Sequence, residues 1–344
     1  MSNLKFAIFG TGFWSQFQLG AWNELRGVEC VALYNRTKFK AEELAKRFGV
    51  PRVYDDPDEL FENEDLDFID IITDVDTHYK FVKMGVDYGL KNIICQKPMA
   101  PDFKTAKRMM ALTREVGVNF YIHENYRWER PLRRFKEILD SGIIGKPFKA
   151  RVTFNSGYPV FDNQPFLAEL DKFILTDMGS HVLDVTRFMF GNCKKLWCQK
   201  LTVNPKIKGE DVASVMMEMD NGMPVFAELS YSSIVEDDAF TTVFILVEGS
   251  KGSIYMGPGF EIRTTTKEGT QSEVVTFPSY DWADPDYIVN HESGIPINQN
   301  ILDDMLGKGK AETTGEDNFE TVKMVWAAYS SAESGEIIEL RNFN

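Results

Sequence analysis

The fold class is decided near the N-terminus by the stretch Lys5-Phe6-Ala7-Ile8-Phe9-Gly10-Thr11-Gly12-Phe13-Trp14-Ser15. Lys5–Phe9 is a short apolar run that predicts a strand, and the glycines after it lead into a segment with helical spacing. In this context a GxGxx(G/A) loop holds a pyrophosphate against a helix N-terminus. Ser15 stands at the third small position and still permits close packing. The stretch predicts a dinucleotide-binding loop, and a plain strand-to-helix turn is the alternative that the motif alone leaves open.

The first third of the chain continues this alternation of strands and helices. The expected strands are Lys5–Phe9, Glu29–Tyr34, Phe68–Ile72, Asn92–Cys95 and Asn119–Ile122. The expected helices include Lys38–Phe48, His78–Tyr88 and Asp102–Val116. Such alternation is typical of βαβ units around a parallel sheet. It predicts an α/β Rossmann domain over residues 1–123.

From about Phe148 the sequence changes to long runs of alternating polar and apolar residues. These runs are KARVTFNS, ASVMMEMDNGMPVFAELSYSS, TTVFILVEGSKGSIYM and FEIRTTT, with turn residues at Asn221-Gly222 and Gly249–Gly252. Helices are expected near Thr176–Phe190 and Asp317–Ser334. Residues 124–344 are therefore expected to form an α+β domain with a large, mostly antiparallel open sheet, with room for the C-terminal helix to pack back on the first domain.

Composition excludes several kinds of partner. A chain of 344 residues that is 43% apolar can bury a sizeable core, and its length suggests about two domains. The net charge of -14 would repel phosphate backbones and anionic lipid, which argues against nucleic-acid and membrane binding. The four cysteines (Cys30, Cys95, Cys193 and Cys198) form no CxxC pair and are expected to be reduced packing residues in a cytoplasmic protein. The scattered histidines and unpaired cysteines predict no metal site.

The end of the second expected strand reads Tyr34-Asn35-Arg36-Thr37. Dinucleotide sites usually place a carboxylate there for the adenosine ribose hydroxyls. Asn35 carries no charge, and the Arg36 guanidinium could pair with a 2'-phosphate, so the sequence favours NADP slightly over NAD. The alternative is that Arg36 is a solvated residue stacked over adenine.

Two further segments carry chemistry. Lys97, in Cys95-Gln96-Lys97-Pro98, follows a strand at the sheet edge where ligands bind, although a Lys-Pro pair there is more often an exposed loop. Asp177, His181 and Asp184 are spaced at i, i+4 and i+7 among apolar neighbours, so on a helix they share one face. Polar groups buried among apolar neighbours must be paired with a partner or have a function. The alternative is an N-cap aspartate with a core histidine.

Taken together, GTGFWS, CQKP and DMGSHVLDVTRFMFG resemble the glucose-fructose oxidoreductase, inositol dehydrogenase and rhizopine catabolism family, Gfo/Idh/MocA. The resemblance continues through LDSGIIGKPFKARV and AETTGEDNFETVKMVWAAYSSAESG, so it covers essentially the whole chain. In that family the second motif is usually Glu-Lys-Pro, and this chain has Gln96 in place of the glutamate.

The resemblance implies a catalytic trio of Lys97, Asp177 and His181, with His181 as the general base, Lys97 on the reacting oxygen and Asp177 as the orienting group. It further implies two sets of binding residues, and it leaves His291 as a surface residue among turn residues. The cofactor set is Gly10, Gly12, Phe13, Trp14, Asn35, Arg36, Thr73, His78, Gln96, Lys97 and Asn125, and the substrate set is Lys97, Arg127, Trp128, Gln164, Asp177 and His181. For His78 a helix-start role, and for Arg127 and Trp128 a bracing role, remain alternatives.

The implied activity is NAD(P)-dependent hydride transfer between the nicotinamide and a hydroxyl or carbonyl of a neutral sugar or cyclic polyol. The implied assembly is a homodimer or homotetramer formed through the open sheet. Two alternatives remain, namely a sugar-nucleotide dehydrogenase or reductase of the same family and a non-catalytic nucleotide-binding sensor. Neither the particular sugar nor the physiological direction follows from the sequence.

Overall fold

The computed structural model describes residues 3–236 and 243–343, and its chain divides into two compact units. The first unit runs to Trp128 and also includes Pro278–Phe319, and the second comprises Glu129–Phe277 and the chain from Glu320 onward. The units thus differ from the expected division at residues 123 and 124, because a segment far along the sequence belongs to the first unit.

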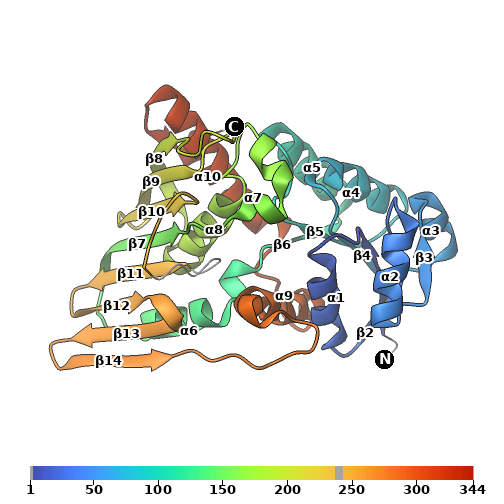
Figure 1. Ribbon diagram of the computed structural model, residues 1–344, viewed down its shortest axis with the longest axis horizontal. Helices are drawn as coiled ribbons and strands as arrows, with labels where there is room; N and C mark the ends of the chain where they lie inside the picture. The colour runs from blue at the N-terminus through green and yellow to red at the C-terminus, as the bar shows by residue number, and fades with distance from the viewer. Residues whose placement is uncertain (1–2, 237–242, 344) are drawn as a thin grey trace. The chain divides into compact units, whose positions relative to one another are not determined.

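A six-stranded sheet forms the centre of the first unit, with the order β3-β2-β1-β4-β5-β6 (Figure 1). Every pairing in it is parallel, which confirms the predicted Rossmann topology. Its core contains Phe6, Phe68 and Trp22, each buried. The strands are β1 (Leu4–Phe9), β2 (Val28–Tyr34), β3 (Arg52–Tyr54), β4 (Phe68–Ile71), β5 (Asn92–Gln96) and β6 (Asn119–His123).

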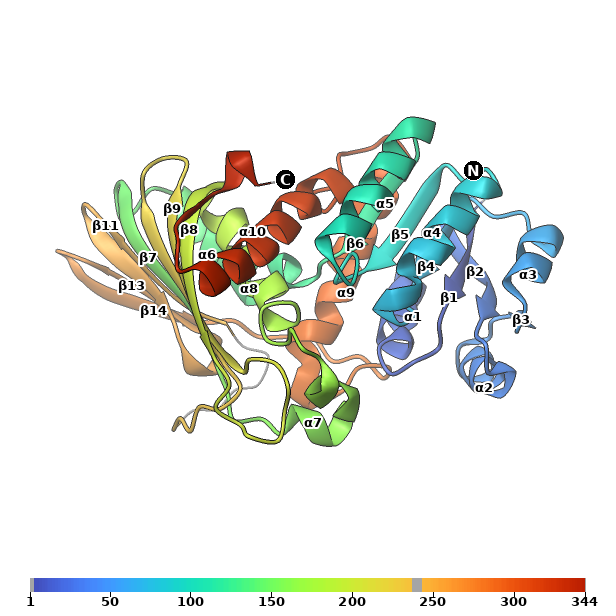
Figure 2. The same cartoon turned by 90° about the horizontal axis from the view of Figure 1, so that it is seen from above.

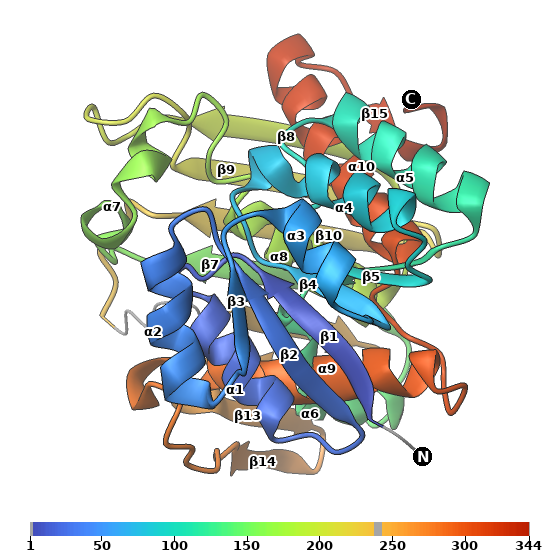
Figure 3. The ribbon, with the colours of Figure 1, turned by 90° about the vertical axis from the view of Figure 1, so that its right-hand side faces the viewer.

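Helices cover this sheet, and Figure 3 shows them around the strands β1, β2 and β4. Helix α4 packs on α5, whereas α1 packs on α9. The α-helices are α1 (Ser15–Asn23), α2 (Lys38–Phe48), α3 (Pro57–Asn63), α4 (His78–Asp87), α5 (Phe103–Val116) and α9 (Ile288–Met305). Short 3-10 turns are η1 (Val75–Thr77), η2 (Tyr126–Trp128) and η5 (Pro285–Tyr287).

Helix α9 corrects the expectation that His291 is a surface residue among turns. His291 lies inside α9, is 2% exposed, and stacks on the ring of Phe17 with centroids 3.5 Å apart. The turn-like residues of this segment have a packing role instead: a Cβ on Gly294 would lie 2.9 Å from the Cβ of Ala21, so the glycine permits close approach of α9 to α1. Pro296 is accommodated within the helix.

The second unit is built on a nine-stranded sheet of order β14-β13-β12-β11-β7-β10-β9-β8-β15. Only the β7–β10 pair is parallel among the described pairings, so the mostly antiparallel prediction is confirmed. The predicted run TTVFILVEG begins with Thr241 and Thr242, which lie outside the described residues. The strands are β7 (Pro147–Asn155), β8 (Cys193–Leu201), β9 (Val212–Met219), β10 (Pro224–Ser230), β11 (Phe244–Gly249), β12 (Gly252–Met256), β13 (Glu261–Thr266), β14 (Gly269–Val274) and β15 (Ile338–Glu339).

Helices lie on one face of this sheet, and its other face carries no helix of the described chain (Figure 2). Helix α10 begins with residues of the first unit and continues into the second. The helices are α6 (Arg130–Asp140), α7 (Val160–Asn163), α8 (Met178–Phe190) and α10 (Gly315–Ser334), with 3-10 turns η3 (Pro165–Glu169), η4 (Pro258–Phe260) and η6 (Leu340–Asn342).

All four cysteines are buried and free of disulfides, which confirms the prediction that they are packing residues. Burial raises the pKa of Cys193 and of Cys198 to about 12, so neither thiol is a ready nucleophile. Within the described residues, none of the helices combines the length and the apolar character needed to span a bilayer.

Candidate active site

The loop between β1 and α1 has the geometry that a dinucleotide requires. Gly10 adopts a φ of 102°, and a Cβ there would lie 2.6 Å from the carbonyl oxygen of Ile72, so only glycine fits. Gly12 is exposed, and a Cβ placed on it would meet no atom within 4 Å. Ser15 is fully buried and its Oγ donates to the Gly12 carbonyl over 2.6 Å. The loop therefore leaves open space directly before α1, and these residues fit a pyrophosphate.

The two aromatic residues of this loop differ in exposure. Phe13 is 71% exposed, whereas Trp14 is partly buried and its indole N–H donates to Oε1 of Gln18 over 3.2 Å. The Trp14 ring also meets the His291 ring edge-on, with centroids 5.8 Å apart. Trp14 is thus held by α1 and α9, while Phe13 faces solvent.

Asn35 and Arg36, the residues predicted to face the adenosine ribose, follow β2. Asn35 accepts the Thr11 N–H with Oδ1 at 3.3 Å and donates to the Thr37 carbonyl over 2.9 Å, so it fixes the end of β2 to the glycine loop. The Arg36 side chain is 84% exposed and lies 3.9 Å from the Asp74 carboxylate. A carboxylate near Arg36 was not predicted, because Asp74 follows a different strand.

His78 is the first residue of α4 and is 1% exposed. Its ring nitrogens lie near main-chain oxygens: Nε2 is 3.0 Å from the Thr73 carbonyl, and Nδ1 is 3.2 Å from that of Pro98 and 3.4 Å from that of Met99. These contacts favour the helix-start role, and contact with a coenzyme stays a prediction. The ring therefore joins the loop after β4 to the loop after β5. Thr73 is partly buried, and its hydroxyl receives a hydrogen bond from Thr77 over 2.7 Å.

Lys97 follows β5 in a partly buried position, next to an acidic neighbour that sequence reasoning missed. Glu124, at the end of β6, is fully buried; burial raises its pKa to about 7, and the positive charges of Lys97 and Arg127 oppose that rise. The backbone N–H of Lys97 donates to Oε1 of Gln96 over 3.0 Å. A carboxyl beside a lysine at the carboxyl edge of a parallel sheet is an arrangement found at functional sites.

Three other predicted residues have partners inside the first unit. Asn125 donates to the Ser293 hydroxyl over 2.8 Å, and it is 4% exposed. Arg127 is 5% exposed and makes an ion pair with Asp317 at 2.8 Å. Trp128 packs in the hydrophobic core of this unit. These contacts favour the bracing role for Arg127 and Trp128, and their contact with a sugar stays a prediction.

In the second unit, Asp177 and His181 lie at the start of α8. Asp177 is the N-cap residue, so the helix begins at Met178, one position after the predicted first-turn aspartate. Its carboxylate does not cap the helix, and Oδ2 accepts the hydroxyl of Tyr231 over 3.1 Å. His181 is 4% exposed, one helical turn further on. Asp184 is fully buried and accepts the Thr321 hydroxyl over 3.0 Å, so it joins α8 to α10 and is structural.

Glu210 holds the segment that leads into α8. It is 1% exposed, and its Oε1 accepts the backbone N–H groups of Phe173 at 3.2 Å and Leu175 at 3.3 Å. The same oxygen accepts the Tyr329 hydroxyl over 2.6 Å, which raises the pKa of that phenol beyond its burial effect. Tyr231 thus holds the Asp177 carboxylate, and Glu210 holds the backbone of the segment before α8. Neither residue was predicted, because both lie far from α8 in the sequence.

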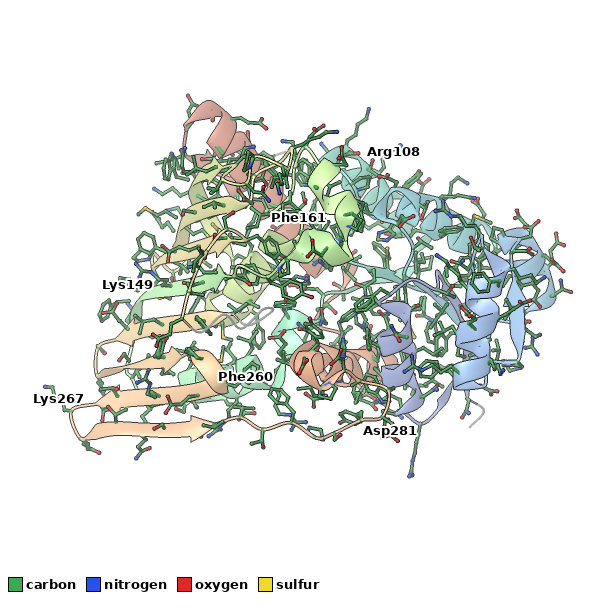
Figure 4. All side chains as sticks on the ribbon, viewed as in Figure 1. Arg108, Lys149, Phe161, Phe260, Lys267 and Asp281 are labelled. Atoms are coloured by element: carbon green, nitrogen blue, oxygen red, sulfur yellow. The ribbon has the colours of Figure 1, made fainter. Side chains whose placement is uncertain are left out.

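Gln164, the remaining predicted substrate residue, is exposed between α7 and η3 in the second unit. Its backbone N–H donates to Val160 over 2.9 Å. Phe161 on the adjoining α7 is labelled in Figure 4. Lys97 belongs to the first unit, whereas Gln164, Asp177 and His181 belong to the second, and each set is described within its own unit.

Comparisons with known proteins agree with this architecture. Residues 4–124 match the oxidoreductase family with an NAD-binding Rossmann fold, and residues 132–255 match the Gfo/Idh/MocA C-terminal domain. The chain is 34% identical over 340 residues to D-apiose dehydrogenase of Rhizobium rhizogenes, covering 99% of this chain and 98% of that protein. It is 26% identical over 234 residues to myo-inositol 2-dehydrogenase of Thermotoga maritima, covering 66% of each.

A solved structure extends the similarity to three dimensions. The oxidoreductase from Agrobacterium radiobacter in complex with NAD+, L-tartaric acid and magnesium has a TM-score of 0.95 and 34% identity, with 99% of each chain covered. The fold and the loop geometry define a nicotinamide-dependent oxidoreductase with a Rossmann domain. The chain belongs to the Gfo/Idh/MocA family, which confirms the resemblance found in the sequence.

Proposed function

We propose that this protein is an NAD(P)-dependent dehydrogenase that acts on a CH–OH group of a neutral sugar or cyclic polyol. The observation that carries the proposal is the Asp177–His181 pair, a carboxylate held by Tyr231 and an imidazole one turn later, in a chain whose other unit has the Gly10–Ser15 loop. The similarity to D-apiose dehydrogenase over 99% of the chain supports a sugar substrate.

The coenzyme would be held by the first unit. Gly10 and Gly12 would receive the pyrophosphate at the start of α1, and Asn35 and Arg36 would face the adenosine ribose. When bound, the nicotinamide supplies the hydride-transfer chemistry. The related Agrobacterium structure contains NAD+, which supports NAD binding here. The slight preference for NADP stays a prediction, since a 2'-phosphate beside Arg36 would also approach Asp74, 3.9 Å from that guanidinium.

We assign three roles at the reacting carbon. His181 accepts the hydroxyl proton during oxidation and returns it during reduction. Lys97 donates to the reacting oxygen and stabilises the negative charge that develops there. Asp177 orients the substrate or His181 through the carboxylate that Tyr231 holds.

A neutral substrate agrees with the charges of the assigned residues. In the second unit the predicted substrate residues are Gln164, Asp177 and His181, which supply no arginine or lysine for a phosphate. The relatives named for D-apiose and myo-inositol make a pentose or an inositol the first substrates to test.

The test is a scan of NAD and NADP reduction with D-apiose, other free aldoses, inositols and sugar phosphates. We expect turnover with at least one unphosphorylated sugar or polyol. Turnover only with a phosphorylated or nucleotide-linked sugar would replace the neutral-sugar assignment with the sugar-nucleotide alternative. Coenzyme binding without turnover of any compound would favour the nucleotide-binding sensor.

We further propose a homodimer or homotetramer formed through the face of the nine-stranded sheet that carries no described helix. This face exposes Trp197 (38%) and Met216 (49%), which are paired across β8 and β9. Lys149, labelled in Figure 4, forms an ion pair there with Glu248. Sedimentation should show an oligomer that Trp197→Glu dissociates, and a wild-type monomer at micromolar concentration would reject the interface. The cytoplasmic location stays a prediction based on the reduced cysteines.

A further inference from the structure

Gln96, which replaces the family's usual glutamate, lies at the centre of a buried hydrogen-bond network. Its Nε2 donates to Oε1 of Gln18 over 2.7 Å and lies 3.3 Å from Nδ1 of His123. Its Oε1 accepts the backbone N–H of Lys97 over 3.0 Å. The side chain is 9% exposed, so protein groups rather than water satisfy both ends of the amide.

The direction of these bonds is fixed on one side by Asp70. Its Oδ2 receives two donors, Nε2 of Gln18 at 2.6 Å and Nε1 of Trp22 at 2.8 Å. Gln18 must therefore turn its Oε1 away from Asp70, toward Gln96. The indole N–H of Trp14 donates to the same Oε1 over 3.2 Å, which holds that orientation. The group facing Gln18 has to be a donor.

His123 fixes the direction on the other side. Its Nε2 lies 3.1 Å from Oδ1 of Asn298, so that nitrogen carries the proton and Nδ1 presents a lone pair to Gln96. Burial lowers the pKa of His123 to about 4, which keeps the ring neutral. Gln96 therefore faces two acceptors with its NH2 group and one donor with its carbonyl.

We propose that Gln96 is the positioning residue of Lys97, and that its network accepts an amide but not the carboxylate usual in the family. A glutamate would place a second acceptor against Oε1 of Gln18 and Nδ1 of His123. Gln18 could not turn without losing its bond to Asp70, and His123 could present a donor only by moving its proton away from Asn298. This inference rests on the role proposed for Lys97.

The same network connects the Lys97 loop to the coenzyme loop. Trp14 is the N-cap of α1 and Gln18 lies in its first turn, directly after Gly10–Ser15. Three titratable groups surround Gln96: His123 on β6, Lys97 beside it in the sequence, and Asp70 on β4, which contacts Gln96 only through Gln18. Burial raises the pKa of Glu124, and the charge of Lys97 in turn opposes that rise. A change at Gln96 should therefore affect Lys97 and α1 together.

Comparison of Gln96→Glu with Gln96→Met tests the proposal, because only the glutamate can recover a donor by taking up a proton. This added proton can reside on the carboxyl or on Nδ1 of His123. In either place it supplies a hydrogen-bond donor between the carboxyl and the His123 ring. The buried carboxyl should have a pKa above its unfolded value of about 4.3. The melting temperature of Gln96→Glu should thus lie only slightly below that of wild type near pH 4.3. The difference between the two should grow as the pH rises toward about 8.

The melting-temperature deficit of Gln96→Met should stay constant over the same pH range. Gln271→Glu, the same change at an exposed position on β14, is the matched control and should show neither effect. With a sugar found in the substrate scan, both Gln96 variants should lose about tenfold or more in kcat, since a small misplacement of a reacting group costs up to about 100-fold. The kcat of Gln96→Glu should recover relative to Gln96→Met as the pH falls.

A deficit of Gln96→Glu that does not change with pH, or a wild-type kcat for Gln96→Met, would overturn the proposal. If Gln96→Glu does not fold, the kcat of Gln96→Met decides alone. Should wild type turn over no sugar, the proposed function fails, while the melting profiles still decide whether the network requires an amide.

Discussion

The hydroxyl of Tyr231 holds the Asp177 carboxylate, and Tyr231→Phe removes that hydroxyl while keeping the ring. The hydroxyl donates to Oδ2 of Asp177 over 3.1 Å. The ring stacks on Phe173 with centroids 5.4 Å apart and meets Phe154 edge-on at 5.1 Å, so a phenylalanine ring keeps the packing. A hydrogen bond to a charged group contributes about 1.5–3 kcal/mol, which corresponds to a loss of roughly 10- to 150-fold in kcat/KM if Asp177 acts in the transition state.

The assay is steady-state coenzyme reduction with a sugar from the substrate scan. The matched control is Tyr88→Phe, because the Tyr88 hydroxyl donates to Asp58 over 2.9 Å on the exposed surface of the first unit. Tyr88→Phe should keep wild-type kcat/KM. In an Asp177→Ala background, which removes the acceptor of this hydrogen bond, Tyr231→Phe should have little further effect, since the two changes remove one interaction. A kcat/KM for Tyr231→Phe within about twofold of wild type, or full additivity with Asp177→Ala, would refute the reasoning.

His181→Asn should lower kcat by about 10² to 10⁴ while coenzyme affinity stays nearly unchanged, and the acidic limb of the kcat/KM profile should disappear; near-wild-type turnover with that limb intact would make His181 a core residue. Arg36→Ala should weaken NADP about tenfold, as expected for one exposed charge-assisted contact, and NAD hardly at all; calorimetry showing equal loss for both coenzymes would reject that role for Arg36. Burial raises the pKa of Asp70 from 3.8 to about 7. The folded state should therefore lose about 4 kcal/mol of stability from this group as the pH rises from about 4 through about 7, and Asp70→Asn should remove that dependence in denaturant titrations.

Local sequence pattern predicted most of the first unit. Lys38–Phe48 forms α2 at those bounds, and the five expected strands differ from the observed ones by one residue at an end. Strand-to-helix alternation and the Gly10–Ser15 loop depend on neighbours in sequence, so they are visible without the fold. The alternating runs predicted the second sheet for the same reason.

Segments whose structure depends on tertiary packing could not be predicted. His291 was expected among turn residues, yet Ile288–Met305 form a helix in which Gly294 permits close contact with Ala21. His291 was misplaced as a consequence. Helix propensity is a weak prior that packing overrides.

The candidate residues were found where a motif carried them, and their supports were not. Asp177, His181 and Lys97 stand in recognisable segments. Tyr231 reaches Asp177 from the end of β10, and Glu124 reaches the surroundings of Lys97 from the end of β6, so each contact depends on how its own sheet is assembled. Asp74 approaches Arg36 across two strand ends, and for this reason the sequence could not weigh its effect on coenzyme choice.

Transfer of deuterium tests the central claim most directly. A sugar that is turned over in the scan is labelled with deuterium at the carbon that bears the reacting hydroxyl, and the reduced coenzyme is analysed by mass spectrometry. If this protein moves a hydride from that carbon to the nicotinamide, each reduced coenzyme molecule carries the deuterium, and the chemical step slows with the labelled sugar. Reduced coenzyme without deuterium, or a protein that binds coenzyme and oxidises no sugar or polyol, would contradict the account.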